Sequence, residues 1–275
     1  MEHRGPDDVG FTATGAAILG ATRLAIRGLA DSNQPIVDDT SGVIVVCNGE
    51  IDNHRELREW LAERGRPVQR ETDVAVIPGL YLELGVKFVE KLAGTFAIAV
   101  WDPRLPRLIL ARDRAGERPL FFTMRGKEII FATEFAALAS DRRLTAKLNK
   151  PAINEYLQFG IFPAPSTPFT EIQKVAPGER VEFDESGMSR HTYWRWKVSG
   201  MPKQSISTDL FDRIFRNAVA RQTDVEVDFG IFLSGGVDSS LVAAVARSIH
   251  PRRTLNAYTV RFREKSYDEG SFAEV

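Results

Sequence analysis

Short apolar runs separated by turn-forming residues dominate the first half of the chain. Four of these runs have the length of buried strands and cover residues 16–19, 43–46, 96–101 and 108–111. A tight connection through Asp102 and Pro103 joins the last two runs, which predicts that they pair as antiparallel strands. Residues 119–122 and 129–132 flank Arg125-Gly126-Lys127 and predict a further hairpin.

Two helices are expected between these strands. Asn53 can act as the N-cap of the first, with Glu56 as its partner in a capping box, and Gly65 can end it. Leu57, Trp60 and Leu61 would then face the core. The second helix is expected over residues 72–85, although a proline at position 78 disfavours regular first turns.

The pattern changes after residue 195. A polar stretch rich in Ser, Gly and Pro indicates a linker over residues 196–208, between domains at 1–195 and 209–275. Apolar positions at helical spacing follow over residues 210–219. A strand at 229–233, a glycine turn, a helix around 241–246 and a strand at 255–262 then predict a βαβ unit with a right-handed crossover. Because one βαβ unit cannot cover both faces of a parallel sheet, we expect the second domain to be cut short.

Composition excludes several classes of protein. Lys and Arg number 36, Asp and Glu number 37, and hydrophobic residues make up 43%, so the chain is neither disordered nor a basic nucleic-acid binder. The longest apolar runs have strand length, which predicts no membrane span, and the polar first residues do not resemble a signal peptide. The single cysteine rules out an internal disulfide, so a cytoplasmic location is expected.

The sharpest chemical signal is Leu-Ser-Gly-Gly-Val-Asp-Ser-Ser at residues 233–240, between a predicted strand and a predicted helix. Gly235 and Gly236 let the backbone approach a ligand closely, so that N–H groups can converge on an anion at the helix N-terminus. The two serines that follow can add hydroxyl donors. Because Asp238 would repel a bare phosphate, it indicates Mg²⁺ between its carboxylate and a pyrophosphate.

This octapeptide resembles the PP-loop of ATP pyrophosphatase domains. The first half adds short motifs in the order found in class II glutamine amidotransferases, among them His3-Arg-Gly-Pro-Asp, Asn48-Gly-Glu-Ile and Ala111-Arg-Asp-Arg. Together they resemble the glutamine-hydrolysing asparagine synthetase family over essentially the whole chain. The resemblance implies an α+β, Ntn-hydrolase-like αββα sandwich followed by the start of an α/β doubly wound parallel-sheet domain of the adenine nucleotide alpha hydrolase type.

The resemblance also implies roles for individual residues. Arg23 matches the residue that holds the glutamine α-carboxylate, Asn48 and Gly49 match the oxyanion hole, and Glu50 and Asp73 match the acceptors of the α-ammonium. Asn48 and Gly49 also count among the glutamine-binding positions. The family's ATP-binding positions match Leu233, Ser234, Gly235, Gly236, Asp238, Ser239, Ser240 and Val260, with Mg²⁺ held by Asp238 through pyrophosphate.

One departure concerns the nucleophile. The family uses an N-terminal cysteine, whereas Glu2 follows Met1 here and the strand that carries the cysteine is expected to be missing. Cys47 ends a predicted buried strand and is expected to be a core residue. No catalytic nucleophile is therefore assigned, and we expect no glutaminase activity from this chain alone.

The resemblance implies an ATP-dependent carbon–nitrogen ligase that amidates aspartate through an aspartyl-adenylate, with ammonia from glutamine. Glutamine, aspartate, ATP and Mg²⁺ would be its small-molecule ligands; nucleic acid and membranes are not expected as partners, and a homodimer is compatible with the resemblance. Two alternatives stay open: another ligase on the same scaffold, similar to β-lactam synthetase, and an inactive degenerate homologue.

Overall fold

The computed structural model describes residues 1–28, 33–145, 147–197, 207–266 and 268–274. The chain forms two compact units, residues 1–197 and 198–275. Most of the expected linker, residues 198–206, lies outside the described residues.

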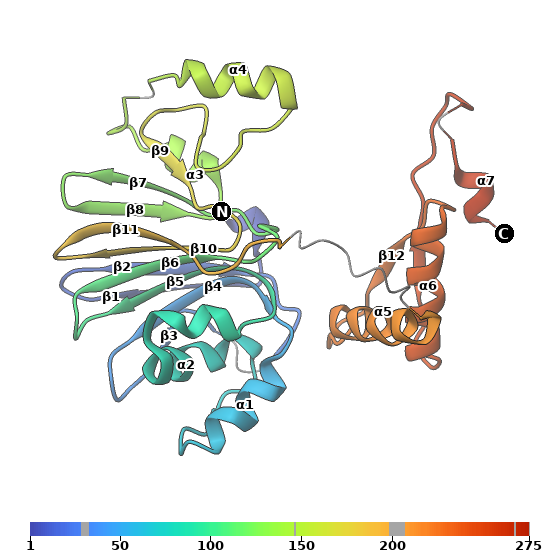
Figure 1. Cartoon of the computed structure of the whole chain (residues 1–275), viewed down its shortest axis with the longest axis horizontal. Coiled ribbons are helices and arrows are strands. Elements are labelled where there is room, and N and C mark those ends of the chain that lie inside the picture. Colours follow the sequence, from blue (N-terminus) through green and yellow to red (C-terminus); the bar gives the residue numbers. More distant parts are fainter. Residues whose placement is uncertain (29–32, 146, 198–206, 267, 275) are drawn as a thin grey trace. The chain divides into compact units, whose positions relative to one another are not determined.

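An antiparallel sheet forms the centre of the first unit (Figure 1). Among the described residues it has six strands, in the order β11-β10-β6-β5-β4-β3. Their bounds are β3 (Ile36–Val37), β4 (Ile44–Ile51), β5 (Gly94–Asp102), β6 (Arg107–Arg112), β10 (Glu179–Asp184) and β11 (Gly187–Thr192). The predicted antiparallel pairing of the runs at 96–101 and 108–111 is confirmed, with Val100 opposite Ile109.

Two smaller sheets pack against one face of the central sheet. One pairs β1 (Asp8–Ala13) with β2 (Ile18–Arg23); the other has the order β8-β7-β9. The latter strands are β7 (Phe121–Arg125), β8 (Glu128–Ala132) and β9 (Ile172–Lys174), and the predicted hairpin around Gly126 is confirmed. Leu19, Leu110 and Phe122 belong to the apolar core between the sheets.

Helices cover the opposite face of the central sheet, where Leu61, Leu80 and Val100 share a second core. These helices are α1 (His54–Ala62) and α2 (Val76–Leu84), accompanied by the 3-10 segments η2 (Asp73–Ala75) and η3 (Gly85–Lys91). A further 3-10 turn is η1 (Glu2–Arg4), and helices α3 (Phe135–Ala139) and α4 (Lys150–Phe159) follow β8. The expected mixed α/β architecture is confirmed.

Both predicted helices differ in detail from expectation. The capping box at Asn53 does not form: its Oδ1 accepts a hydrogen bond from the N–H of Ala93 at 2.9 Å, and its Nδ2 donates to the carbonyl of Lys91 at 3.0 Å. A tertiary contact has therefore replaced the local one, and α1 ends at Ala62, before Gly65. The second predicted helix is divided, because η2 precedes α2.

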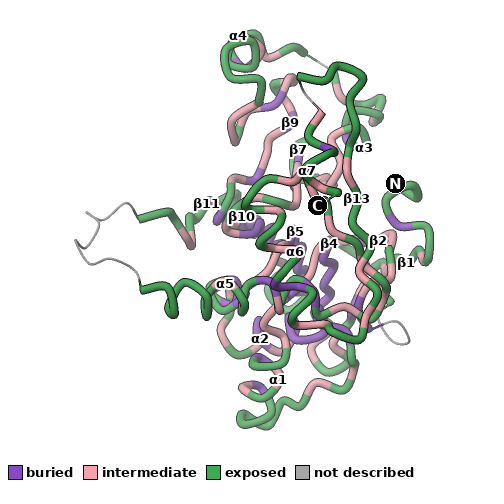
Figure 2. Tube along the Cα trace, turned by 90° about the vertical axis from the view of Figure 1, so that its right-hand side faces the viewer, coloured by how far each residue is buried: buried purple, intermediate pink, exposed green. Residues whose placement is uncertain are grey.

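The second unit contains the predicted βαβ element. Strands β12 (Gly230–Phe232) and β13 (Asn256–Tyr258) are parallel, and α6 (Val237–Ile249) connects them. Helices α5 (Thr208–Gln222) and α7 (Gly270–Ala273) complete the described part. Its core among the described residues is small, with Val219, Val245 and Ala246 fully buried. Much of this unit is consequently exposed, as Figure 2 shows for α5 and α6.

We expect this difference in core size to be measurable as a difference in local stability. In the intact chain, backbone amides of β12 and β13 should exchange with solvent at least about 100-fold faster than those of β5, because local opening is easier where few apolar side chains are buried. Hydrogen–deuterium exchange read out by mass spectrometry measures this directly. Equal protection of the two regions would contradict the prediction.

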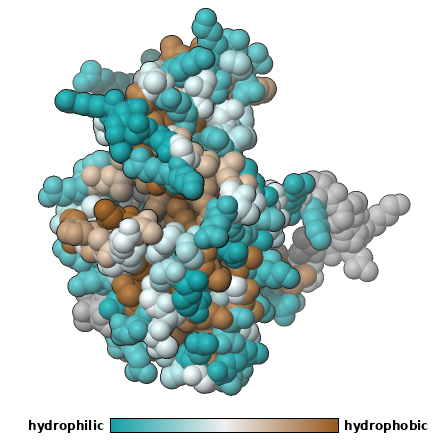
Figure 3. Space-filling model, turned by 90° about the vertical axis from the view of Figure 1, so that its left-hand side faces the viewer, coloured by the Kyte–Doolittle hydropathy of each residue, from teal (hydrophilic) through white to brown (hydrophobic). Residues whose placement is uncertain are grey.

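Within the described part of the chain, every helix is too short or too polar to traverse a lipid bilayer. Figure 3 shows apolar side chains scattered between polar ones on the face where the strand hairpins turn. Phe11 and Ile18, on the outward side of β1 and β2, are among the exposed apolar residues.

Candidate functional site

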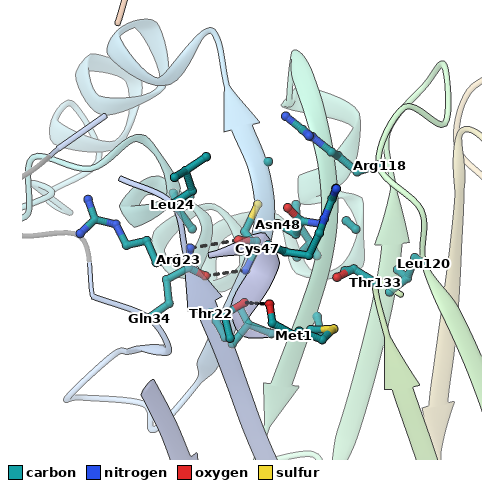
Figure 4. A pocket seen from close by; sticks show the side chains of 18 of the residues that line it. Met1, Thr22, Arg23, Leu24, Gln34, Cys47, Asn48, Arg118, Leu120 and Thr133 are labelled. Atoms are coloured by element: carbon teal, nitrogen blue, oxygen red, sulfur yellow. Dashed lines mark hydrogen bonds between the residues drawn. The ribbon is translucent and has the colours of Figure 1, made fainter. Parts of the chain in front are cut away.

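A cavity of about 570 Å³ lies in the first unit and is lined by residues of β2, β4, β5, β8 and η2. Figure 4 shows β4 at its centre, with Thr22 and Arg23 on one side and Leu120 and Thr133 on the other. Strands β2 and β8 belong to different sheets, so the cavity separates two sheet edges. All the residues predicted to bind glutamine line it, namely Arg23, Asn48, Gly49, Glu50 and Asp73.

Strand β4 extends beyond the predicted residues 43–46 and includes Asn48, Gly49 and Glu50, which follow Cys47. Successive side chains of a strand point to opposite faces. Val46 belongs to the core beside the smaller sheets and Cys47 to the core beside the helices. By the same alternation, the side chains of Asn48 and Glu50 lie on the cavity side of β4.

Cys47 is a buried free thiol, as expected. Burial raises its pKa well above the ordinary value, and the nearby carboxylates of Asp73 and Glu50 raise it further, although Arg118 acts in the opposite direction. Because the thiolate is the nucleophilic form, a thiol in these surroundings is a poor nucleophile.

Gly49 has a backbone that other residues rarely adopt, with φ of +144°. On the edge of β4 that faces away from β5, the N–H of Cys47 donates to Gln34 Oε1 at 2.6 Å and the N–H of Ile51 donates to Asp73 Oδ2 at 2.6 Å. Alternation along the strand puts the N–H of Gly49 on this same edge. A backbone N–H beside a side-chain amide such as that of Asn48 is the kind of donor pair from which an oxyanion hole is built.

At one end of the cavity, the carboxylates of Glu50 and Asp73 lie close to the guanidinium of Arg27. Arg27 Nε lies 3.4 Å from Glu50 Oε2, and Arg27 Nη1 lies 4.0 Å from Asp73 Oδ2. Burial raises the pKa of Glu50 to about 7, and the charge of Asp73 adds to this effect, while Arg27 opposes it. Such a pair of carboxylates is suited to binding a cation from the cavity.

Arg23 lines the cavity, but its guanidinium is turned toward the segment that follows β2. Its Nη2 donates to the carbonyl of Gly28 at 3.2 Å and lies 3.4 Å from the carbonyl of Arg27. Figure 4 shows the side chain directed away from Asn48. Binding a ligand carboxylate there would require the guanidinium to exchange or share these bonds.

Three further arginines line the cavity, Arg4, Arg27 and Arg118, and sequence reasoning assigned none of them to the site. Arg27 follows Arg23 by four residues, and Arg118 precedes Pro119. Figure 4 shows Arg118 extending from the wall opposite Arg23. Its Nε is buried and has no hydrogen-bond partner among the described residues. No local pattern distinguishes Arg27 or Arg118 from an ordinary surface arginine.

The glycine turn of the second unit joins β12 to α6, as predicted. Gly235 has φ of +80°, and Asp238 lies in the first turn of α6. The Ser239 hydroxyl donates to the carbonyl of Gly236 at 3.1 Å and lies 3.0 Å from Ser234 Oγ. This hydroxyl, which was predicted to be able to donate to an anion, is thus hydrogen-bonded within the loop.

The other predicted nucleotide-binding positions surround this turn. The N–H of Leu233 donates to the carbonyl of Tyr258 at 2.9 Å, so Leu233 continues the pairing of β12 with β13. Val260 is exposed beyond the end of β13. In the described ranges, no group of three or more His, Cys, Asp or Glu side chains is arranged to hold a metal ion.

The sequence profile of the glutamine amidotransferase domain family matches residues 1–194, which is more than half of the chain. The chain belongs to the glutamine amidotransferase family. The asparagine synthase profile matches residues 210–275 of the same chain. The cavity therefore lies within the amidotransferase domain, and the glycine turn lies in the region that matches asparagine synthase.

Several curated relatives are named glutamine-hydrolysing asparagine synthetases. The chain is 30% identical to glutamine-hydrolysing asparagine synthetase 3 of Bacillus subtilis (strain 168), covering 96% of this chain and 44% of the relative. It is 33% identical to glutamine-hydrolysing asparagine synthetase 2 of Arabidopsis thaliana, covering 90% of this chain and 38% of the relative. The chain thus spans less than half the length of either relative.

A weaker likeness connects the chain with a solved structure. It aligns with the glutamine phosphoribosylpyrophosphate amidotransferase of B. subtilis, complexed with ADP and GMP, at a TM-score of 0.46 and 19% identity. The alignment covers 90% of this chain and 52% of that structure.

Proposed function

We propose that this chain forms part of an ATP-dependent ligase of the asparagine synthetase type. In this proposal the first unit, as an Ntn-hydrolase-type domain, binds the glutamine from which the protein that carries this chain obtains ammonia, and the second unit begins a PP-loop domain that activates aspartate. The observation that carries the proposal is the meeting of Arg23, Asn48, Gly49, Glu50 and Asp73 in one cavity. The names of the curated relatives support it.

In the glutamine site, each end of the substrate would meet a complementary group. Arg23 would hold the α-carboxylate, and Glu50 with Asp73 would accept the α-ammonium. Asn48 and the N–H of Gly49 would donate to the side-chain carbonyl oxygen as negative charge develops on it. We assign no nucleophile, because the single cysteine belongs to the helix-side core.

In the second unit, the backbone N–H groups of Gly235 and Gly236 and the N-terminus of α6 would bind the phosphates of ATP. Aspartate would displace pyrophosphate from ATP to give aspartyl-adenylate, and ammonia would then displace AMP to give asparagine. Asp238 alone is not a metal cage, but one carboxylate suits Mg²⁺ that is held mainly by phosphates. When bound there, Mg²⁺ would neutralise charge that develops on the leaving pyrophosphate.

The test compares two nitrogen sources in the protein that carries this chain. Arg23→Met is expected to lower glutamine-dependent asparagine formation by about 10- to 100-fold, because a charged hydrogen bond to the substrate is lost. Ammonia-dependent formation should stay within about twofold of the unchanged protein, since ammonia does not use the Arg23 site.

Arg125→Met serves as the matched control, because Arg125 lies on the β7–β8 hairpin, outside the set of residues that line the cavity. Loss of both activities in Arg23→Met would contradict the division between the two units. Pyrophosphate release that depends on an acceptor other than aspartate would replace the proposal by a different ligase on the same scaffold.

A further inference from the structure

Arg27 occupies an unusual place in the cavity. Its side chain is 7% exposed and lies near three carboxylates, two at or just beyond the end of β4 and one in η2. Nε lies 3.4 Å from Glu50 Oε2, Nη2 lies 3.4 Å from Asp52 Oδ1, and Nη1 lies 4.0 Å from Asp73 Oδ2. Burying a guanidinium among three carboxylates costs desolvation energy, which these ion pairs must offset.

The three carboxylates differ in their access to the cavity. Glu50 is 23% exposed, whereas Asp52 is 9% and Asp73 is 4% exposed. Asp73 is also fixed by the N–H of Ile51 at 2.6 Å. Glu50 is therefore the carboxylate that a ligand in the cavity can reach. Asp52 and Asp73 are less exposed and contact the guanidinium of Arg27.

We propose that Arg27 is a positioning residue of the ammonium subsite, which holds Glu50 and Asp73 as an ionised pair with Glu50 directed at the ligand. This inference rests on the proposed function, because that function assigns the ammonium to these two carboxylates. The charges agree with it: one guanidinium among three carboxylates leaves two negative charges, so the subsite still attracts a ligand ammonium.

The electrostatic surroundings favour the same role. Without a cation, buried carboxylates this close together take up a proton instead of ionising fully. Burial and Asp73 raise the pKa of Glu50 to about 7, and the charge of Arg27 limits that rise. Electrostatic interactions also connect Glu50, Asp73 and Arg27 with other titratable or charged groups nearby, namely Cys47, His54, Arg55, Arg58 and Arg118.

Removal of the guanidinium should therefore raise the pKa of Glu50 further. A protonated carboxyl group cannot form an ion pair with an ammonium, so a variant without the guanidinium should bind glutamine poorly near neutral pH and recover at higher pH. A loss of packing alone would lower affinity at every pH. The pH profile thus separates a positioning role from a structural one.

The experiment measures binding of two ligands to the 275-residue chain by isothermal titration calorimetry between about pH 6 and pH 9. L-Glutamine carries the α-ammonium, and glutaramate is the same molecule without its α-amino group. In the unchanged chain, the preference for glutamine should rise as pH increases through about 7 and then hold until the α-ammonium of glutamine itself loses its proton. Arg27→Met should move this midpoint upward by at least about one pH unit and reduce the preference at neutral pH about tenfold.

Two further variants make the test specific. Arg27→Lys keeps the charge and should keep the midpoint within about half a pH unit. Glu50→Gln should give a small preference that does not depend on pH, and Arg27→Met added to it should change that preference by less than about twofold. An unchanged midpoint in Arg27→Met, or an equal loss of affinity for both ligands, would overturn the inference.

A second measurement needs no ligand and separates this inference from the proposed function. Because the pKa of Glu50 is raised on folding, its carboxyl stabilises the fold below the unfolded-state pKa, and this advantage is lost as pH rises toward about 7. Glu50→Gln should accordingly gain stability relative to the unchanged chain over that interval. In the Arg27→Met background the gain should extend to higher pH.

The outcomes separate the two proposals. If glutamine does not bind but the stability gain of Glu50→Gln extends to higher pH in Arg27→Met, the proposed function fails and the effect of Arg27 on Glu50 stands. If the gain does not extend to higher pH, the inference fails.

Discussion

Gly49→Ala is expected to lower the free energy of unfolding by about 3 to 5 kcal/mol. Two costs add at this position. The backbone φ of +144° is strained for any residue with a Cβ atom, and a Cβ there would lie 1.9 Å from the carbonyl oxygen of Thr95 and 2.7 Å from Cα of Phe96. Relief of this clash requires β4 and β5 to separate where Gly49 pairs with Phe96.

Chemical denaturation followed by circular dichroism measures the loss. Gly65→Ala is the matched control, because Gly65 also has a positive φ, of +74°, but a Cβ there would meet no atom within 4 Å. That variant should lose only about 1 kcal/mol. Similar losses in the two variants would show that the approach of β5 does not require glycine at position 49.

Gly235→Val is expected to reduce ATP-dependent pyrophosphate release about a thousandfold in the protein that carries this chain. The reason is local. Gly235 has φ of +80°, and a Cβ there would lie 2.5 Å from Cβ of Phe272 and 2.8 Å from its carbonyl carbon. A β-branched residue would force the turn to rearrange, and the N–H groups proposed to bind phosphate would no longer converge.

Gly236→Ala provides the comparison. Gly236 has φ of −73°, and the nearest atom to an added Cβ is Ser234 Oγ at 3.2 Å, which a side chain can relieve by rotating. Pyrophosphate release should fall by no more than about tenfold in this variant. If Gly235→Val retains the activity of Gly236→Ala, the turn does not bind phosphate through its backbone.

The sequence predicted β4, β5 and β6 of the central sheet and the βαβ element because their interiors are continuous apolar runs, but it predicted no strand at β3, β10 or β11. It failed at β4 after residue 46, where Asn48 and Glu50 face a cavity and not a core. Polar side chains on the cavity side remove the apolar signal by which a strand is recognised. The residues that end the recognisable strand are therefore the ones that build the site.

Long-range contacts explain the other differences. Asn53 has the right residue type for an N-cap, but its side chain bonds to Lys91 and Ala93, which are distant in sequence. Arg27 has no local signature at all, since its partners Glu50 and Asp73 come from β4 and η2. Predicting either arrangement requires knowledge of which segments meet in the folded chain.

The contact between Gln34 and Cys47 has a consequence for self-association. Strand β3 pairs with β4 only through Ile36 and Val37, and continued pairing would place residue 34 opposite Cys47. There the Gln34 side chain takes the place of a backbone: its Nε2 donates to the Cys47 carbonyl at 3.0 Å, and its Oε1 accepts from the Cys47 N–H. The Gln34 carboxamide thus bonds both the N–H and the carbonyl of Cys47, which are the groups that a strand from another molecule would need for pairing. At this position the sheet edge is therefore protected from edge-to-edge aggregation.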